Sequence, residues 1–134
     1  IDRSLVGSEM CIRDRLSRVY YINHLGTSSV LLDPLYFGAG NSFHESMVYG
    51  TPTVTMPTKF IKSRIVSAAY MQMEIEKPPI VKNKNEYVEL AIDIANSDNL
   101  LEIKKYYQKK ANEKLFNTTK AGEEFNQILL GLEQ

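Results

Sequence analysis

The fold is decided by residues 33–57, which read DPLYFGAGNSFHESMVYGTPTVTMP. The apolar run from Val30 to Pro34 leads into this stretch and predicts a short buried parallel strand. A glycine-rich loop follows over 35–41, and the pattern then predicts a short helix from Ser42 to Tyr49. The β-branched run Thr53–Met56 predicts a second strand. A strand, a glycine loop, a helix and a second strand in this order are typical of an α/β protein with a parallel sheet.

Helical patterns flank this stretch on both sides. Before it, apolar spacing from Leu16 predicts a helix that we expect Gly26 to end. After it, Asn83 and Glu86 form a capping-box pattern at a helix start. The patterns predict helices over residues 63–73, 87–95, 100–115 and 121–132, and a brief strand at 80–81.

This order of elements predicts a parallel sheet with flanking helices. Only two strands are clear, whereas half of a doubly wound domain normally has more. We therefore expect an α/β fold that is the C-terminal portion of a Rossmann-like nucleotide-binding domain, incomplete at its beginning. The terminal helices are expected to cover one flank of the sheet.

Composition limits the kind of protein. With 134 residues, the chain has room for one domain, and 16 basic residues balance 16 acidic ones. A net charge of zero argues against a nucleic-acid partner bound through excess positive charge. The longest apolar runs are too short to span a membrane. With the single cysteine Cys11 and two histidines, we expect no disulfide, no metal site and a cytoplasmic location.

The first fifteen residues form a separate region in this interpretation. The chain starts with Ile1, and residues 4–15 read SLVGSEMCIRDR, without a clear apolar period. This stretch resembles a translated adapter tail, and the alternative is a frayed native terminus. We expect residues 1–15 to be non-native or disordered and residues 16–134 to form the partial nucleotide-binding domain. Packing of Leu5, Val6, Met10 and Ile12 into the core would contradict the first interpretation.

The glycine loop carries the candidate chemistry. Ligands of open α/β sheets bind beyond the carboxyl ends of the strands. Gly38 and Gly40 let the backbone approach a ligand closely, and the following helix start offers free N–H groups to a phosphate. Asn41 and Ser42 add side-chain donors there. The carboxylate of Glu45, one turn later, can accept hydrogen bonds from two adjacent sugar hydroxyls. Together these groups indicate a nucleotide-diphosphate site.

Each part of this pattern also has a purely structural interpretation. A lone pair of glycines often marks only a tight turn. Ser42 and Glu45 have the spacing of a capping box, in which the glutamate serves its own helix. His44 is more often an ordinary packed or surface residue than a catalyst, and Tyr36 and Phe37 are expected to pack within the loop.

The wider sequence resembles the nucleotide-sugar-binding region of GT-B glycosyltransferases. More narrowly, it resembles the C-terminal catalytic region of the O-linked N-acetylglucosamine transferase and SPINDLY family, over roughly residues 19–132. The resemblance rests on these motifs: LDPL at 32–35, GAGNSFHE at 38–45, YGTPTVTMP at 49–57, SRIVSAAY at 63–70 and, more weakly, IVKNKNEYVELA at 80–91.

The resemblance implies specific roles for the loop. Gly40, Asn41 and Ser42 match the positions that hold the donor diphosphate. Family members often have threonine there, and the asparagine and serine keep the capacity to form hydrogen bonds. Glu45 matches the acidic residue that binds the ribose.

Three further residues match positions near the donor. Tyr21 matches a position against the nucleobase, where its ring could stack on uracil, and ordinary core packing is the alternative. His24 is expected to border the same pocket. Arg64, with Lys59 and Lys62, could form an anion-facing patch beside the loop, and the alternative is a solvated cluster with one structural salt bridge.

The resemblance also implies a division of labour. The catalytic base and the acceptor-binding repeats of this family lie in an N-terminal part that these residues do not include. The chain is then expected to bind a UDP-sugar, the donor substrate, without a cofactor or metal, and the full-length enzyme to act on a protein or peptide. Alternatives are another GT-B glycosyltransferase, a UDP-sugar epimerase, or a non-catalytic interaction module using the lysine-rich helix 104–114.

Overall fold

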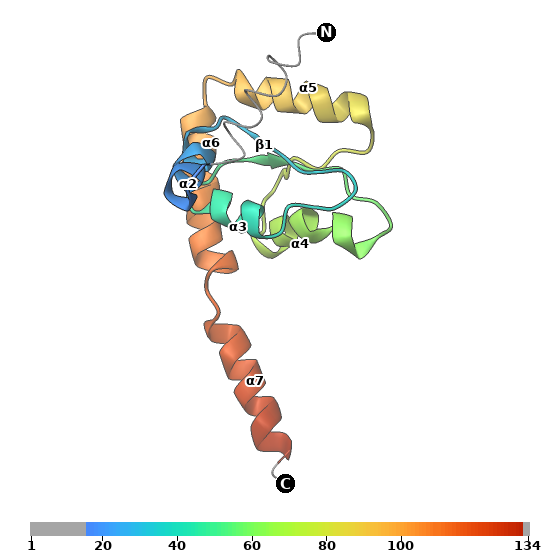
Figure 1. Cartoon of the computed structure of the whole chain (residues 1–134). Coiled ribbons are helices and arrows are strands. Elements are labelled where there is room, and N and C mark those ends of the chain that lie inside the picture. Colours follow the sequence, from blue (N-terminus) through green and yellow to red (C-terminus); the bar gives the residue numbers. More distant parts are fainter. Residues whose placement is uncertain (1–15, 133–134) are drawn as a thin grey trace.

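The computed structural model of the protein describes residues 16–132. The N-terminal region 1–15, with Leu5, Val6, Met10 and Ile12, lies outside the described residues, as do residues 133–134. The described part is rich in helix around a small parallel sheet (Figure 1). Its elements are α2 (Arg18–Thr27), β1 (Leu31–Leu32), α3 (Asn41–Met47), β2 (Thr53–Val54), a 3₁₀ turn (Ile61–Ser63), α4 (Ile65–Gln72), α5 (Lys84–Ala95), α6 (Leu100–Lys110), a π-helical turn (Ala111–Leu115) and α7 (Thr119–Leu132).

The two strands pair in parallel, with Leu31 opposite Thr53 and Leu32 opposite Val54. A third segment adds to the sheet through a single parallel bridge between Thr55 and Ile80. Both predicted strands and the brief third one are therefore confirmed, although each is shorter than its sequence pattern. Parallel strands connected through helices assign the described part to the α/β class at this coarse level.

Apolar side chains are buried in two clusters, associated with different helices. Figure 1 shows α5 on one side of the sheet and α3 and α4 on the other. The larger cluster joins α3, α4 and α6, and the smaller one joins the sheet to α5. The larger contains Phe43, Met47, Val66, Ala69, Tyr70, Met73, Ile75, Tyr107 and Ala111, and the smaller contains Val54, Val81 and Ala91.

Helix ends follow the sequence prediction in some places and depart from it in others. Asn83 caps α5: its Oδ1 accepts a hydrogen bond from the Glu86 N–H at 2.9 Å, which confirms the capping box. Gly26 does not end the first helix, since α2 continues to Thr27. The capping box at Ser42 and Glu45 is wrong, because α3 begins at Asn41 and Ser42 already lies inside it.

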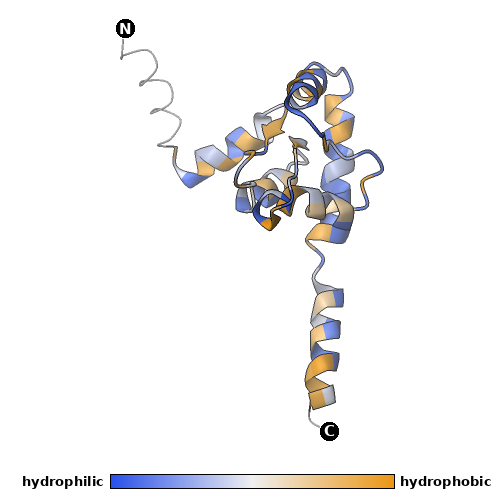
Figure 2. Ribbon diagram, turned by 90° about the vertical axis from the view of Figure 1, so that its right-hand side faces the viewer, coloured by the Kyte–Doolittle hydropathy of each residue, from blue (hydrophilic) through white to orange (hydrophobic). Residues whose placement is uncertain are grey.

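The last helix does not cover the flank of the sheet as predicted. α6 packs into the larger core, whereas α7 extends away from the body and buries none of its residues (Figures 1 and 2). Figure 2 shows more polar residues in the first half of α7 and mainly apolar ones toward its end. The amphipathic spacing correctly predicts a helix here. It does not predict the position of the helix, because spacing alone does not determine what the apolar face contacts.

Gly50 is the point where the turn after α3 passes beneath α6. Its φ is +69°, in the left-handed region, as the sequence predicts. A Cβ at this position would overlap the carbonyl oxygen of Lys104 on α6. Glycine is therefore required both by the backbone conformation and by the close approach of α6.

We expect Gly50→Ala to lower the free energy of unfolding by about 3 kcal/mol or more, since it combines backbone strain with overlap. Urea unfolding followed by circular dichroism measures this loss. Gly122→Ala is the matched control, because a Cβ there meets nothing within 4 Å. It should raise helix content without destabilising the body. Equal stability of Gly50→Ala and wild type would contradict the packing of α6 described here.

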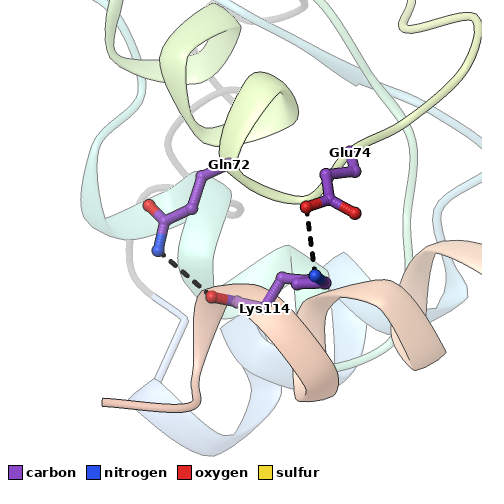
Figure 3. Close-up of polar contacts among 3 residues, drawn as sticks. All are labelled: Gln72, Glu74 and Lys114. Atoms are coloured by element: carbon purple, nitrogen blue, oxygen red, sulfur yellow. Dashed lines mark hydrogen bonds and ion pairs between the residues drawn. The ribbon is translucent and has the colours of Figure 1, made fainter. Parts of the chain in front are cut away.

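An ion pair connects the end of α4 to the π-helical turn after α6 (Figure 3). The Lys114 Nζ lies 3.0 Å from Glu74 Oε1, and the Lys114 carbonyl accepts a hydrogen bond from Gln72 Nε2 at 3.1 Å. Glu74 has a φ of 54°, unusual for a residue other than glycine. The hydrogen bond and charge of Lys114 hold the pKa of Glu74 below its ordinary value of 4.5.

This ion pair predicts a pH dependence. A lowered pKa in the folded state adds stability above the ordinary pKa, and that contribution disappears as the pH falls through the folded value. Glu74→Gln should therefore destabilise the protein at neutral pH and make little difference well below pH 4.5. In Lys114→Met, an NMR titration should give a higher Glu74 pKa than in wild type. Glu113→Gln is the control. It removes an exposed glutamate that lies 4.0 Å from Lys109 and leaves the pair of Glu74 and Lys114 intact, so it should not reproduce the pH dependence.

Candidate functional site

Asp33 organises the loop that follows β1. Its side chain is buried, and both carboxylate oxygens accept hydrogen bonds, Oδ1 from the Ala39 N–H at 2.7 Å and Oδ2 from the Thr55 hydroxyl at 2.6 Å. The Asp33 carbonyl accepts a third hydrogen bond from the Tyr87 hydroxyl at 2.8 Å. Burial and the nearby Asp33 charge raise the pKa of Tyr87 to about 12, so this phenol stays protonated as a donor. One residue thus connects β1, the glycine loop, the end of β2 and α5.

The surrounding structure requires glycine at one of the two loop positions, Gly38, and not at the other, Gly40. The Gly38 N–H donates to the Lys62 carbonyl at 2.8 Å, and a Cβ on Gly38 would lie 3.0 Å from that oxygen. Gly38 therefore seats the loop against the 3₁₀ turn. At Gly40 the nearest atom to an added Cβ is 4.0 Å away, on Ile65. Packing does not require glycine at this second position, which precedes the first residue of α3.

Tyr21 and Ser42 are brought together although they lie on different helices. The Tyr21 hydroxyl donates to Ser42 Oγ at 2.8 Å, and both residues are half-buried. Because Ser42 Oγ accepts this hydrogen bond, its own O–H remains able to donate to another group. The hydrogen bond fixes α2 against the start of α3, so the candidate diphosphate residue and the candidate nucleobase residue share one corner of the molecule.

Asn41 and Glu45 lie one turn apart on α3, so their side chains share a face. Asn41 is exposed and Glu45 is half-buried. Within residues 16–132, neither side chain forms a hydrogen bond or an ion pair. Glu45 is thus not serving its own helix as a cap, which removes its structural interpretation at this point.

His44 and Arg64 line one shared hollow of about 470 Å³ between α3 and α4. The His44 Nδ1 lies 2.9 Å from the Gly40 carbonyl oxygen, which can only accept, so Nδ1 carries a proton. Arg64 is exposed and precedes α4, and its side chain has no salt bridge to the described residues, contrary to the structural alternative. His24 is exposed on α2. Its ring forms no hydrogen bond within the described part of the chain.

The lysine-rich helix 104–114 is largely engaged within the molecule. Lys104 donates from Nζ to the carbonyls of Gly26, at 2.8 Å, and Ser28, and so caps the end of α2. Burial lowers the pKa of Lys104. Lys114 pairs with Glu74, and Lys110 lies 6.0 Å from the ring centroid of Tyr106. These contacts account for much of the helix's positive charge without a partner molecule.

Compared with known proteins, the chain matches no protein-family model and no curated protein. Within residues 16–132, no helix is long and apolar enough to cross a membrane. The same residues contain no group of three His, Cys, Asp or Glu side chains close enough to hold a metal ion.

Sequence reasoning missed the residues that shape the site from behind. The sequence patterns include Asp33 only within a motif and Thr55 only within a strand. An aspartate directly after a buried strand, with a threonine at the end of the next strand, is the signal that could have paired them. Tyr36 and Phe37 were expected to pack in the loop. This prediction is wrong, since they are 82% and 70% exposed.

Two threonines of the β2 region provide a matched test of the Asp33 connection. Thr55 donates to Asp33, whereas the buried Thr53 Oγ1 has no hydrogen-bond partner among the described residues. The Thr53 backbone is satisfied instead by the Tyr70 hydroxyl, which accepts from the N–H at 2.7 Å and donates to the carbonyl at 2.9 Å.

We expect Thr55→Val to cost about 1–3 kcal/mol of unfolding free energy, because it leaves a buried carboxylate oxygen without its donor. Thr53→Val should be neutral or stabilising, because it removes an unsatisfied buried hydroxyl and keeps the shape. Urea unfolding of both variants measures the difference. Equal losses in the two variants would contradict the role assigned to Asp33.

Proposed function

We propose that this chain supplies the donor diphosphate and ribose site of a UDP-sugar-dependent glycosyltransferase, of the protein O-linked N-acetylglucosamine transferase type. The Rossmann-like GT-B architecture is part of this proposal. The observation that carries it is that Asn41 and Glu45, whose side chains have no partner among the described residues, share α3 with Ser42, beside a loop held in place by Asp33. The order of motifs that resembles this family gives those groups their roles.

In this proposal, the N–H groups after Gly40 and the side chains of Asn41 and Ser42 hold the diphosphate. The Tyr21 hydroxyl donates to Ser42 at 2.8 Å, which leaves the serine proton free for a phosphate oxygen. α3 has only seven residues, so individual donors matter more here than its helix dipole. As the bond between the sugar and the diphosphate breaks, negative charge develops on the departing diphosphate, and such fixed donors stabilise that charge.

Glu45 supplies the ribose contact. Its carboxylate is half-buried and unengaged among the described residues, on the same face of α3 as Asn41. A carboxylate with free lone pairs can accept hydrogen bonds from both ribose hydroxyls. The catalytic base and the acceptor site belong, in this proposal, to other parts of the full-length enzyme. A cytoplasmic location is likewise proposed, because a single cysteine is typical of a protein from a reducing compartment.

Calorimetry with UDP and the full chain tests the ribose role. We expect Glu45→Ala to weaken UDP binding about tenfold, the usual worth of a hydrogen bond to a charged group. Wild type should prefer UDP to 2′-deoxyuridine diphosphate, and Glu45→Ala should lose that preference. Glu89→Ala, an exposed acid on α5, is the matched control and should bind as wild type does. An unchanged UDP affinity in Glu45→Ala, or no UDP binding by the folded chain, would overturn the proposal.

A further inference from the structure

A second hollow lies at the carboxyl edge of the sheet, and of the residues considered for the donor only Lys62, from the anion-facing patch, lines it. It has a volume of about 310 Å³ and is bounded by the loop after β1, the loop after β2 and the start of α5. The half-buried Leu35 and Met56 form part of its wall, and the exposed rings of Tyr36 and Phe60 form another part. We call it the edge pocket. Its position, beyond the carboxyl ends of the strands, is where open α/β sheets bind ligands.

The charged side chains that line the edge pocket are all positive. Lys62 and Lys84 line it, and no acidic residue does so in the described part of the chain. The neighbouring Lys59 lies 5.3 Å from the ring centroid of Phe60. The whole segment 46–73 contains no aspartate or glutamate. The Glu86 carboxylate, near Lys84 in sequence, accepts hydrogen bonds from Asn83 Nδ2 and the Lys82 N–H and is not among the residues that line the pocket. The pocket thus complements a negatively charged partner.

The apolar surface continues beyond the pocket. Tyr36 is 82% exposed, and Phe37, the next residue in the sequence, is 70% exposed. Contiguous exposed aromatic and aliphatic groups mark protein-interaction surfaces, whose centres are rich in aromatic residues. The volume itself is at the small end for ligand sites and suits one large side chain. A polypeptide uses both the pocket and the surface around it, which a small molecule cannot.

We propose that the edge pocket docks an acidic polypeptide segment. One aromatic or aliphatic side chain of the segment enters between Tyr36 and Phe60, and flanking carboxylates pair with Lys62 and Lys84. This inference does not depend on nucleotide binding, so the UDP titration and the experiment below succeed or fail separately.

The test uses the full chain and a short blocked peptide with glutamates on both sides of one phenylalanine. Fluorescence anisotropy of the labelled peptide reports binding. Replacing the glutamates by glutamine, or the phenylalanine by alanine, should each weaken binding about fivefold or more. Phenylacetate offers the same ring and charge as a small molecule, and it should compete only weakly.

Variants of the chain locate the site. Lys62→Gln and Lys84→Gln should each weaken binding about two- to fivefold, the range of exposed ion pairs, and more at low salt than at high salt. Both side chains are exposed, and Lys62 holds Gly38 through its carbonyl, so the fold should persist. Tyr36→Ala should weaken binding further without affecting stability. Lys77→Gln, an exposed lysine before the third sheet segment at the opposite edge, should have no effect.

Several results would overturn this inference. One is equal binding of the glutamate and glutamine peptides, and another is an equal loss in Lys77→Gln and Lys62→Gln. Competition by phenylacetate as strong as by the peptide would make the pocket a small-molecule site. Light scattering that shows self-association abolished by Tyr36→Ala would make the occupant a second copy of the chain. No peptide binding by the folded chain would also refute it.

Discussion

The buried carboxylate of Asp33 is the interaction on which the rest of the structure depends. A sheet with two short paired strands and one bridge has few ladder hydrogen bonds with which to hold its loops. Asp33 compensates by bonding to the loop ahead of α3, to the end of the neighbouring strand and, through its carbonyl, to α5. Polar groups inside a protein must be satisfied, and here the partners of one residue come from three separate segments. The glycine loop has a defined shape because the Ala39 N–H is held by the buried Asp33 carboxylate.

Local sequence patterns predict the helices and strands, and they do not predict the contacts between segments that are distant in sequence. The strands, the cap at Asn83 and the left-handed Gly50 follow from propensity, spacing and backbone geometry, which neighbouring residues determine. The hydrogen bond between Tyr21 and Ser42 and the burial of Asp33 depend on how the helices pack. The direction of α7 belongs to the same group, since an amphipathic stripe predicts a helix and leaves its neighbour undefined. Ser42 with Glu45 shows the opposite error: the capping-box spacing is present, but Gly40 is the N-cap of α3 and Ser42 lies two residues after it, inside the helix.

The two candidate surfaces share one backbone and differ in chemistry. Around α3 the groups are hydrogen-bond donors and one unengaged carboxylate, which suit a sugar phosphate. At the edge pocket they are rings and lysines, which suit an acidic chain. Gly38 lies between these regions, because its N–H binds the carbonyl of Lys62, whose side chain lines the pocket. This hydrogen bond connects the two surfaces through the backbone.

The passage of α6 over Gly50 has a consequence for how the protein is made. Lys104 caps α2 and Gln108 donates to the Val48 carbonyl, so α6 closes the far side of both helices that meet at Ser42. A chain growing from its N-terminus produces the glycine loop long before these residues emerge from the ribosome. The contacts of α6 with α2 and with the end of α3 can therefore form only after this segment is synthesised, and a chain cut short ahead of Lys104 would carry every residue of the candidate donor site without them.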